Sequence, residues 1–85
     1  MFNELAMKLS LYHSPWCPFC VRVVSVLKQL DLDIELRDTA NKQYFMALRE
    51  GGGKTQVPCL KIETDKGIKW MYESSDIIHY LKSLS

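Results

Sequence analysis

Hydrophobic and polar positions alternate along two short stretches in the first half of the chain. Leu9 and Leu11 alternate with more polar neighbours, and residues 34–37 repeat the pattern as Ile, Glu, Leu and Arg. A period of two residues is typical of a strand with one buried face. We therefore predict one strand over residues 9–12 and a second over residues 34–37.

The stretch between these strands has helical spacing. From Pro18 to Leu30, apolar side chains cover a wide face and leave Arg22, Ser25 and Gln29 on a polar stripe. Its valines would also suit a strand, but the stretch is longer than an ordinary strand. Length therefore favours a helix. A second helix is indicated by apolar residues at helical spacing over 44–48, with Asn41 or Thr39 as N-cap and the three glycines at 51–53 as its end.

The remaining residues predict a hairpin and a last helix. Residues 57–62 form a third strand that starts at Pro58, because proline cannot donate to a central ladder. A turn over 64–67 leads to a fourth strand over 69–72. A serine N-cap and Asp76 then open the last helix. The predicted class is α/β, with a single four-stranded mixed sheet and three helices in the order β-α-β-α-β-β-α.

Length and composition limit the classes of protein. Eighty-five residues make one domain, which we place at residues 8–85 after a short N-terminal extension at 1–7. The formal net charge is +1, and the basic and acidic residues are interspersed along the chain, so we expect neither nucleic acid nor a membrane as partner. The first residues do not resemble a signal peptide, and no apolar run approaches the ~20 residues of a membrane helix.

Cys17 and Cys20 form the strongest chemical signal. Pro18 suits the first turn of a helix, so Cys17 would lie at a helix N-terminus, where the macrodipole favours a thiolate. Cys20 lies one turn further on and can close a disulfide with it. A zinc site is the weaker alternative, because Cys59 and the two histidines are scattered. A redox pair and an odd count of three cysteines indicate a cytoplasmic protein.

Three motifs at compatible spacings now carry a resemblance. They are Cys17-Pro18-Phe19-Cys20, Val57-Pro58 at the start of a strand and Glu73-Ser74 at the start of the last helix. From Lys8 to Leu84 the chain resembles a glutaredoxin of the thioredoxin fold. Residues 55–58 and 71–81 are similar to the glutaredoxin branch that shares features with glutathione transferase N-terminal domains.

The resemblance implies a role for each motif. Cys17 would be the nucleophile and Cys20 the resolving thiol. Pro58 would be a cis proline facing them, and the backbone of Val57 would pair with glutathione. Two further residues, Glu73 and Ser74, would hold the γ-glutamyl end. For Ser74 an ordinary N-cap is the alternative interpretation.

Other residues depart from the family or extend its site. Many glutaredoxins have a lysine where this chain has Ser14, so we assign the glycine carboxylate of glutathione to Lys54, with Gln56 as a polar neighbour. A solvated loop lysine is the alternative. Trp16 is more typical of thioredoxin and would narrow the groove or contact a protein substrate, unless it is a partly buried loop aromatic. Phe19 completes the expected glutathione-binding set.

The sequence thus predicts a glutathione-dependent thiol-disulfide oxidoreductase of cell redox homeostasis. It would reduce glutathione mixed disulfides and protein disulfides, use glutathione as co-substrate, need no metal or bound cofactor and act as a monomer. The alternatives are a thioredoxin-like reductant fed by a reductase and a non-enzymatic carrier of an iron-sulfur cluster ligated by glutathione. A glutathione transferase fragment is a further one, although a dithiol is not what transferases use. Cys59 is interpreted as a small buried hydrophobe, and Trp70 and Tyr72 as packing residues.

Overall fold

The protein folds as a four-stranded mixed sheet between two layers of helix. The computed structural model describes residues 7–84. The elements in chain order are β1 (Lys8–His13), α1 (Pro18–Gln29), β2 (Glu35–Asp38), α2 (Lys42–Gly52), β3 (Cys59–Thr64), β4 (Gly67–Met71) and α3 (Ser74–Ser83). This is the predicted order of elements. The predicted extension at residues 1–7 lies outside the described part of the chain, apart from Met7.

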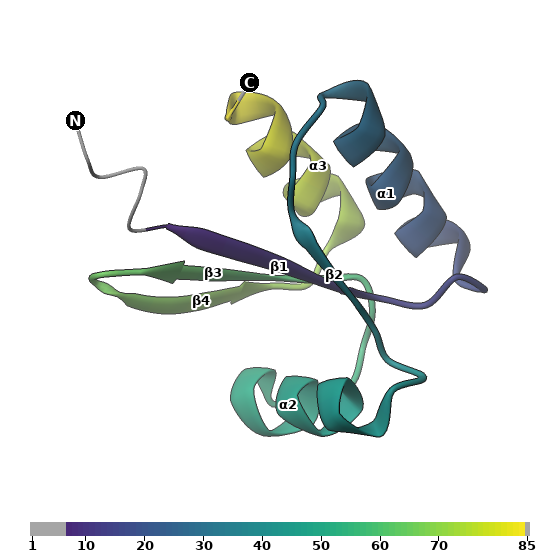
Figure 1. The fold of residues 1–85 in the computed structure, drawn as a ribbon, viewed down its shortest axis with the longest axis vertical. Helices are drawn as coiled ribbons and strands as arrows, with labels where there is room; N and C mark the ends of the chain where they lie inside the picture. The colour runs from purple at the N-terminus through teal and green to yellow at the C-terminus, as the bar shows by residue number, and fades with distance from the viewer. Residues whose placement is uncertain (1–6, 85) are drawn as a thin grey trace.

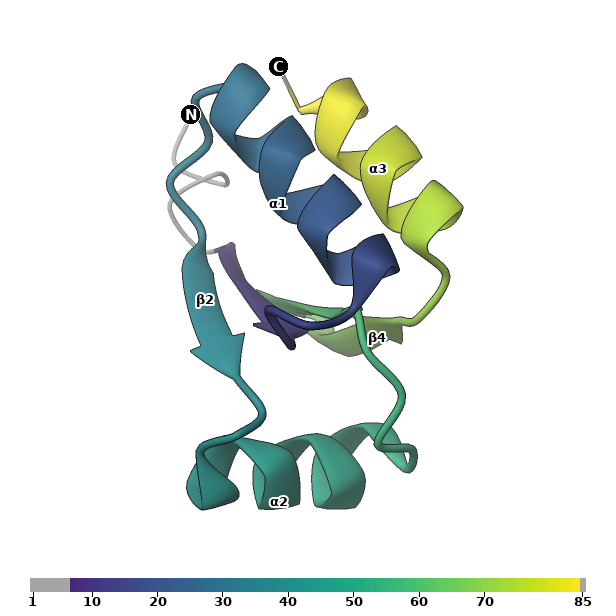
Figure 2. The ribbon, with the colours of Figure 1, turned by 90° about the vertical axis from the view of Figure 1, so that its right-hand side faces the viewer.

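The strands lie in the order β2-β1-β3-β4. β1 pairs with β2 in parallel and with β3 antiparallel, and β3 pairs antiparallel with β4. Helices α1 and α3 cover one face of this sheet, whereas α2 lies on the other (Figure 1). Figure 2 shows α1 and α3 side by side above the sheet. The predicted α/β thioredoxin-like fold is therefore confirmed.

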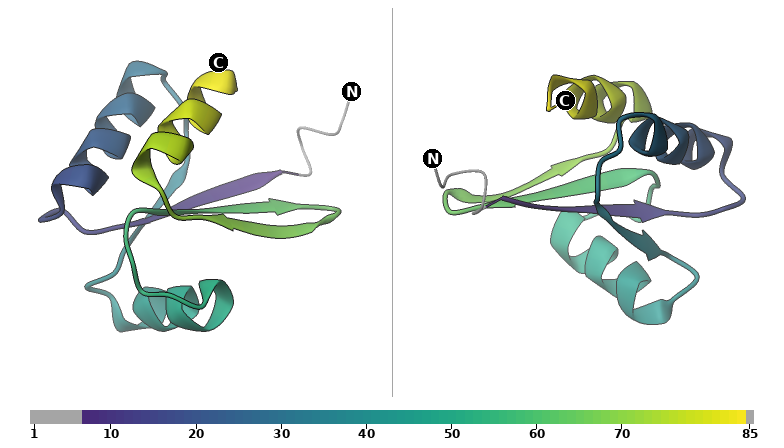
Figure 3. Two further views of the ribbon diagram at one scale, coloured as in Figure 1. Left: turned by 180° about the vertical axis from the view of Figure 1, so that it is seen from behind. Right: turned by 45° about the horizontal axis from the view of Figure 1, so that its top comes forward.

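Alternate residues of the strands supply two separate cores. Leu11 of β1 packs with Val23 and Leu27 of α1 and with Leu81 of α3. On the opposite face, Tyr12 packs with a second set of residues, Leu48 and Cys59 among its buried members. Successive side chains of a strand point to opposite faces, which is why neighbours in β1 enter different cores. The β3-β4 hairpin extends beyond the helices that cover the sheet (Figure 3).

The prediction that all three glycines end the second helix is wrong. α2 continues through Gly51 and Gly52, and only Gly53 is its cap, with a left-handed φ of 87°. The first two glycines lie against aromatic side chains of the sheet. A Cβ at Gly51 would collide with the ring of Trp70, and one at Gly52 would collide with the hydroxyl of Tyr72. These glycines therefore serve close packing of α2 on the sheet rather than a turn.

The structure tests the predicted N-cap residues of α2 and α3. Asn41 is the N-cap of α2, and its side chain accepts hydrogen bonds from the N–H groups of Gln43 and Tyr44. The prediction of a serine N-cap for the last helix is wrong, because Glu73 occupies the N-cap position and Ser74 is the first helical residue. Glu73 has the extended backbone of an N-cap residue, so the helix begins at Ser74, one residue earlier than a cap at Ser74 would allow.

Candidate functional site

Cys17 sits where β1 delivers the chain to α1. It is the N-cap residue of α1, with extended backbone angles, and Pro18 is the first residue of the helix. The Cys17 N–H donates to the Ser14 carbonyl at 3.1 Å, and the Val21 N–H donates to the Cys17 carbonyl at 3.0 Å. No side chain caps this helix end. Cys17 is therefore held at the start of α1, at the positive end of the helix dipole.

Cys20 has the opposite environment. It is completely buried, whereas Cys17 is partly exposed, and both are free thiols. The pKa of Cys20 is raised to about 12, mainly because the thiol is buried; a backbone hydrogen bond with Ser14 opposes the change, and the neighbouring Cys17 thiol adds to it. Only the thiol of Cys17 can meet a substrate from solvent. The two cysteines are therefore chemically unequal, as the predicted roles of nucleophile and resolving thiol require.

The segment between α2 and β3 reaches the start of α1 (Figure 2). The Val57-Pro58 peptide bond is cis, as predicted. Pro58 is buried and stands directly before the first residue of β3. The Val57 carbonyl lies 3.9 Å from the Cys17 sulfur, within hydrogen-bonding distance of the thiol. The sheet and the linking segment therefore place the Val57 backbone beside the exposed cysteine.

A small cavity of about 140 Å³ adjoins this backbone, and we call it the Phe19–Ser74 cavity. Its lining residues are Phe19, Gln56, Val57, Pro58, Tyr72, Glu73 and Ser74. Six of these seven were predicted from the sequence, although they come from three separate stretches of the chain. Ser74 is not the N-cap, so the interpretation of its hydroxyl as an ordinary cap is wrong. The first turn of α3 therefore opens toward the cavity without a side-chain cap of its own.

Tyr72 is the lining residue that the sequence interpretation missed. It contributes to the core on the α2 face, so its interpretation as a packing residue is correct but incomplete. Its hydroxyl donates to the Lys54 carbonyl at 3.2 Å. The available sequence signal was its position directly before Glu73-Ser74, since consecutive residues at the start of a helix can share one cavity wall. An aromatic residue near a strand end gave no further indication of this second role.

Two predicted residues, Lys54 and Trp16, lie outside the cavity lining. The Lys54 ammonium stands over the ring of Tyr72, 5.2 Å from its centroid, so Lys54 borders the cavity through that ring. Trp16 is 90% exposed, which excludes the interpretation as a partly buried aromatic. Its backbone N–H donates to the Ser14 hydroxyl at 3.4 Å, and its side chain is free to contact a partner. Phe19, which does line the cavity, is itself 58% exposed.

Cys59 lies behind the cavity wall. It is completely buried, which confirms its interpretation as a small buried hydrophobe. Burial raises the pKa of the Cys59 thiol to about 11, and a hydrogen-bonding contact with the Tyr72 hydroxyl opposes the change. Cys59 is therefore a neutral thiol that supports Tyr72 from behind.

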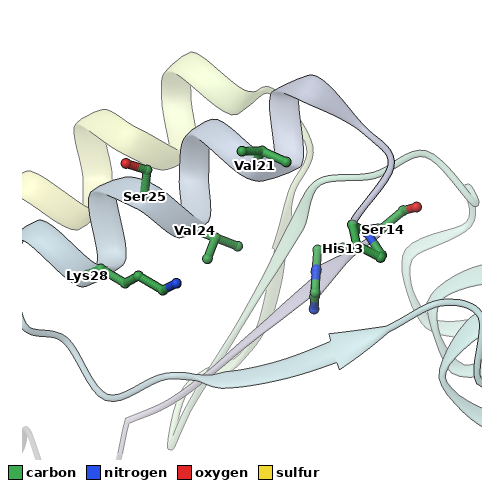
Figure 4. Close-up of a pocket in the computed structure, with 7 residues that line it drawn as sticks. His13, Ser14, Val21, Val24, Ser25 and Lys28 are labelled. Carbon is green, nitrogen blue, oxygen red and sulfur yellow. The ribbon is translucent and has the colours of Figure 1, made fainter.

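A larger cavity of about 310 Å³ lies on another side of α1. Figure 4 shows Val24 and Lys28 of α1 on the side of the helix where His13 lies. Neither member of the dithiol lines it, nor does any residue of the predicted glutathione set. The larger volume of this cavity therefore does not identify it as the functional site. We assign the functional site to the smaller cavity beside Cys17.

Within residues 7–84, no group of three or more His, Cys, Asp or Glu side chains is placed to hold a metal ion. None of the helices in this part of the chain is long and apolar enough to cross a membrane.

Comparison with known proteins gives a family match over most of the chain. Residues 11–85 match the family described as the glutathione S-transferase N-terminal domain. No match was found among curated proteins. The fold is also similar to solved structures of glutathione proteins.

A maleylacetoacetate isomerase from Anaeromyxobacter dehalogenans, with glutathione bound in its active site, is 27% identical with a TM-score of 0.70. The match covers 92% of this chain and 38% of the isomerase. The trimeric glutathione transferase TDR1 from Leishmania is 25% identical with a TM-score of 0.74, over 92% of this chain and 18% of the transferase. This chain therefore spans well under half of either relative.

A wheat glutaredoxin is 23% identical, with a TM-score of 0.65, over 94% of this chain and 77% of the glutaredoxin. At this identity the likeness shows the fold alone. The glutaredoxin nevertheless has a length close to that of the present chain, whereas the isomerase and the transferase are much longer.

Proposed function

Because the chain belongs to the glutathione S-transferase N-terminal domain family, we propose that it is a glutathione-dependent thiol-disulfide oxidoreductase of the glutaredoxin type. The family supports a glutathione-related role in redox or transfer chemistry. The observation that carries the redox assignment is the pair of unequal thiols. Cys17 is accessible at the start of α1 beside the Val57 carbonyl, and Cys20 is buried one turn behind it.

The proposed reaction starts with the Cys17 thiolate. It attacks the glutathione sulfur of a mixed disulfide, so a Cys17-glutathione disulfide forms while the substrate sulfur leaves and takes up a proton. A second glutathione then attacks this disulfide, which releases oxidised glutathione and restores Cys17. With a protein disulfide as substrate, Cys17 forms a mixed disulfide with the protein, and Cys20 displaces the protein thiol. Two glutathione molecules supply the electrons in that case.

The residues of the Phe19–Ser74 cavity would orient glutathione for this attack. The Val57 backbone would pair with the cysteinyl part of the tripeptide, since it lies next to the Cys17 sulfur. Ser74 and the N–H groups at the start of α3 would hold the γ-glutamyl carboxylate, and Glu73 would meet the neighbouring ammonium. Lys54, with Gln56 beside it, would meet the glycine carboxylate. Phe19 and Pro58 would supply apolar walls.

Glutathionylated proteins and proteins with disulfides would be the substrates, with Trp16 as a contact on the exposed rim. We propose that the protein acts as a cytoplasmic monomer with no metal or bound cofactor. Glutathione would be consumed as a co-substrate rather than held as a prosthetic group.

One observation favours a second candidate function. The 90% exposure of Trp16 directly before the dithiol would suit a thioredoxin-like reductant that receives electrons from a reductase and contacts large protein surfaces. The cavity beside Val57 and Ser74 favours glutathione instead, because a protein reductase would need no pocket for a small peptide.

A paired assay distinguishes the two functions. A glutathionylated protein is offered with glutathione and glutathione reductase in one reaction, and with thioredoxin reductase in the other. We expect rapid release of the protein thiol in the first reaction and little in the second. The reverse result would replace glutathione by a reductase as electron donor, and slow release in both would contradict the redox assignment.

A further inference from the structure

We propose that Tyr72 is a positioning residue that gives the site its preference for a tripeptide thiol with a free carboxylate at its far end. It would do so by holding Lys54 at the border of the Phe19–Ser74 cavity. The inference rests on the proposed function, because it names the form of thiol that the same site selects. It adds a residue to which neither the motifs nor the family match gives a role.

The Tyr72 side chain is held by a hydrogen bond and by packing. Its hydroxyl donates to the Lys54 carbonyl at 3.2 Å, although the two residues are 18 positions apart in the chain. Tyr72 also packs against the core cluster that contains the completely buried Cys59. A buried neighbour on one side and a loop carbonyl on the other leave the side chain little freedom. The backbone of the loop at Lys54 is therefore tied to the wall of the cavity.

The ring of Tyr72 positions the Lys54 side chain as well. The Lys54 ammonium lies 5.2 Å from the ring centroid, the geometry of a cation-π contact. No carboxylate lies within 4.0 Å of this ammonium among the described residues, whereas the salt bridges found in this part of the chain use Lys8, Arg37 and Lys61. The same ring lines the cavity. Lys54 is thus a cation held beside the ligand space and available to an anion.

Gly52 shows that the position of Tyr72 has a structural requirement. Gly52 is the last residue of α2, directly before the Gly53 cap. A Cβ there would collide with the Tyr72 hydroxyl. Any other residue at position 52 would have to displace either the helix or the hydroxyl that bonds to Lys54. The glycine therefore leaves the room in which Tyr72 makes its two contacts.

We call Tyr72 and the Lys54 side chain over its ring the arm of the cavity. The contacts of this arm define the ligand that it would recognise. Glu73 and Ser74 follow Tyr72 directly and line the same cavity, so one end of a bound peptide is accounted for by the start of α3. The Lys54 ammonium lies over the Tyr72 ring, where a second anionic group of the ligand would meet it. Glutathione carries such a group in its glycine carboxylate. Its glycine ethyl ester lacks that charge and carries an ethyl group on the carboxyl.

The test compares two mixed disulfides of one model peptide, made with glutathione and with its glycine ethyl ester. Release of the peptide thiol by the reduced protein gives kcat/KM for each, and their ratio is the carboxylate preference. We expect a clear preference for the free carboxylate in the wild type. Tyr72→Phe should reduce this preference about threefold to tenfold. Lys54→Met should abolish the preference, and Lys54→Arg should retain most of it.

Matched controls are available in the same chain. Tyr80→Phe removes another tyrosine hydroxyl, which contacts Met7 rather than the cavity, and Lys69→Met removes an exposed lysine of β4. Both should leave the preference unchanged. A general loss of packing would lower both rates together and leave their ratio intact. An unchanged ratio in Tyr72→Phe, or equal rates for the two disulfides in the wild type, would overturn the inference.

A binding experiment separates this inference from the proposed function. The Cys17→Ser variant is titrated with S-methylglutathione and with its glycine ethyl ester, and the amide signals of residues 54–57 and 72–76 are followed by NMR. Tighter binding of the free acid, lost when Lys54→Met is added, supports the arm even if no disulfide is reduced. Equal binding of the two ligands would overturn the arm even if glutathione-dependent reduction is observed.

Discussion

The helix α2 begins in a different way from α1 and α3. Asn41 closes the first turn of α2 by accepting hydrogen bonds from the N–H groups of Gln43 and Tyr44. Cys17 and Glu73, the N-cap residues of α1 and α3, make no such side-chain bond. N–H groups in a first helical turn have no partner within the helix. The first turns of α1 and α3 therefore remain available to a thiolate and to an anionic ligand, whereas α2 has an end built for stability.

The open helix ends also lie close together. α1 and α3 run side by side on one face of the sheet (Figure 2), and Phe19 of α1 lines the same cavity as Ser74 of α3. The capped end of α2 lies on the opposite face (Figure 1). Capping and function are thus separated by the sheet. Substitutions at the open ends should change activity, and substitutions at the capped end should change stability.

The largest effect is expected from the open end of α1. Cys17→Ser should abolish all thiol exchange, because the accessible thiol is lost. Cys20→Ser should keep much of the activity on glutathione mixed disulfides, since a second glutathione can resolve the intermediate, and should lose the reduction of protein disulfides. Both activities are measured for each variant with the same coupled assay. An equal loss in both variants would show that the roles of the two cysteines are assigned wrongly.

The next effect concerns the open end of α3. Ser74→Ala should raise the KM for glutathione by roughly tenfold to a hundredfold, the equivalent of losing a charge-assisted hydrogen bond of about 1.5–3 kcal/mol. Combination with Glu73→Gln should raise it further. Alkylation of Cys17 should proceed at an unchanged rate, because neither residue acts on the thiol.

The control for Ser74 is its neighbour Ser75, which is exposed and does not line the cavity. Ser75→Ala should leave glutathione kinetics unchanged. Since Glu73 rather than Ser74 is the N-cap, Ser74→Ala should also leave thermal stability nearly unchanged. A stability loss with normal glutathione kinetics would remove Ser74 from the glutathione site.

A third prediction uses the buried thiol behind the site. The pKa of Cys59 is about 11 in the folded protein because of burial, against an ordinary value of 9.0. In the unfolded chain Cys59 therefore loses its proton at a lower pH than in the folded protein. The contribution of this thiol to the free energy of unfolding is complete below pH 9 and is lost as the pH rises toward 11. In this range Cys59→Ser should reduce the pH slope of the unfolding free energy by about 1.4 kcal/mol per pH unit. Denaturant unfolding at several pH values measures the slope, and identical slopes would contradict the assignment.

Substitutions at an open and at a capped helix end should have smaller effects, of opposite sign, on the free energy of unfolding. Cys17→Ser places a preferred N-cap residue at the open end of α1, so we expect the free energy of unfolding to rise by about 1 kcal/mol while activity disappears. Thermal unfolding of the reduced proteins measures this change. A destabilised Cys17→Ser variant would show that the open end has no unused capping capacity.

The capped end of α2 gives the complementary result. Asn41→Ala should lower the free energy of unfolding by about 1 kcal/mol, or the melting temperature by roughly 4–8 °C for a domain of this size. The KM for glutathione should stay the same, because the capped end lies across the sheet from the Phe19–Ser74 cavity. A changed KM with unchanged stability would reverse the comparison between the two faces.

The sequence by itself determined the elements and most of the cavity wall. Alternation identified the strands, and the length of the valine-rich stretch identified α1. Pro18 after Cys17 was enough to place the cysteine at a helix start, because proline restricts the backbone locally. Phe19, Gln56 and Glu73 were predicted for one site because each adjoins a motif with a recognised position in the fold. Such signals depend on near neighbours in the chain.

The tertiary structure decided how distant side chains share space. The pairing of β3 with β4 and the packing of α2 under the sheet place Tyr72 against both Lys54 and Gly52. These partners are about twenty residues away in the chain, so no local pattern in the sequence reports the contact. The same packing explains why α2 continues through Gly51 and Gly52. The sequence suggested that these two glycines form a turn. In the fold they leave room for the side chains of Trp70 and Tyr72, because a Cβ at either position would overlap with an aromatic side chain.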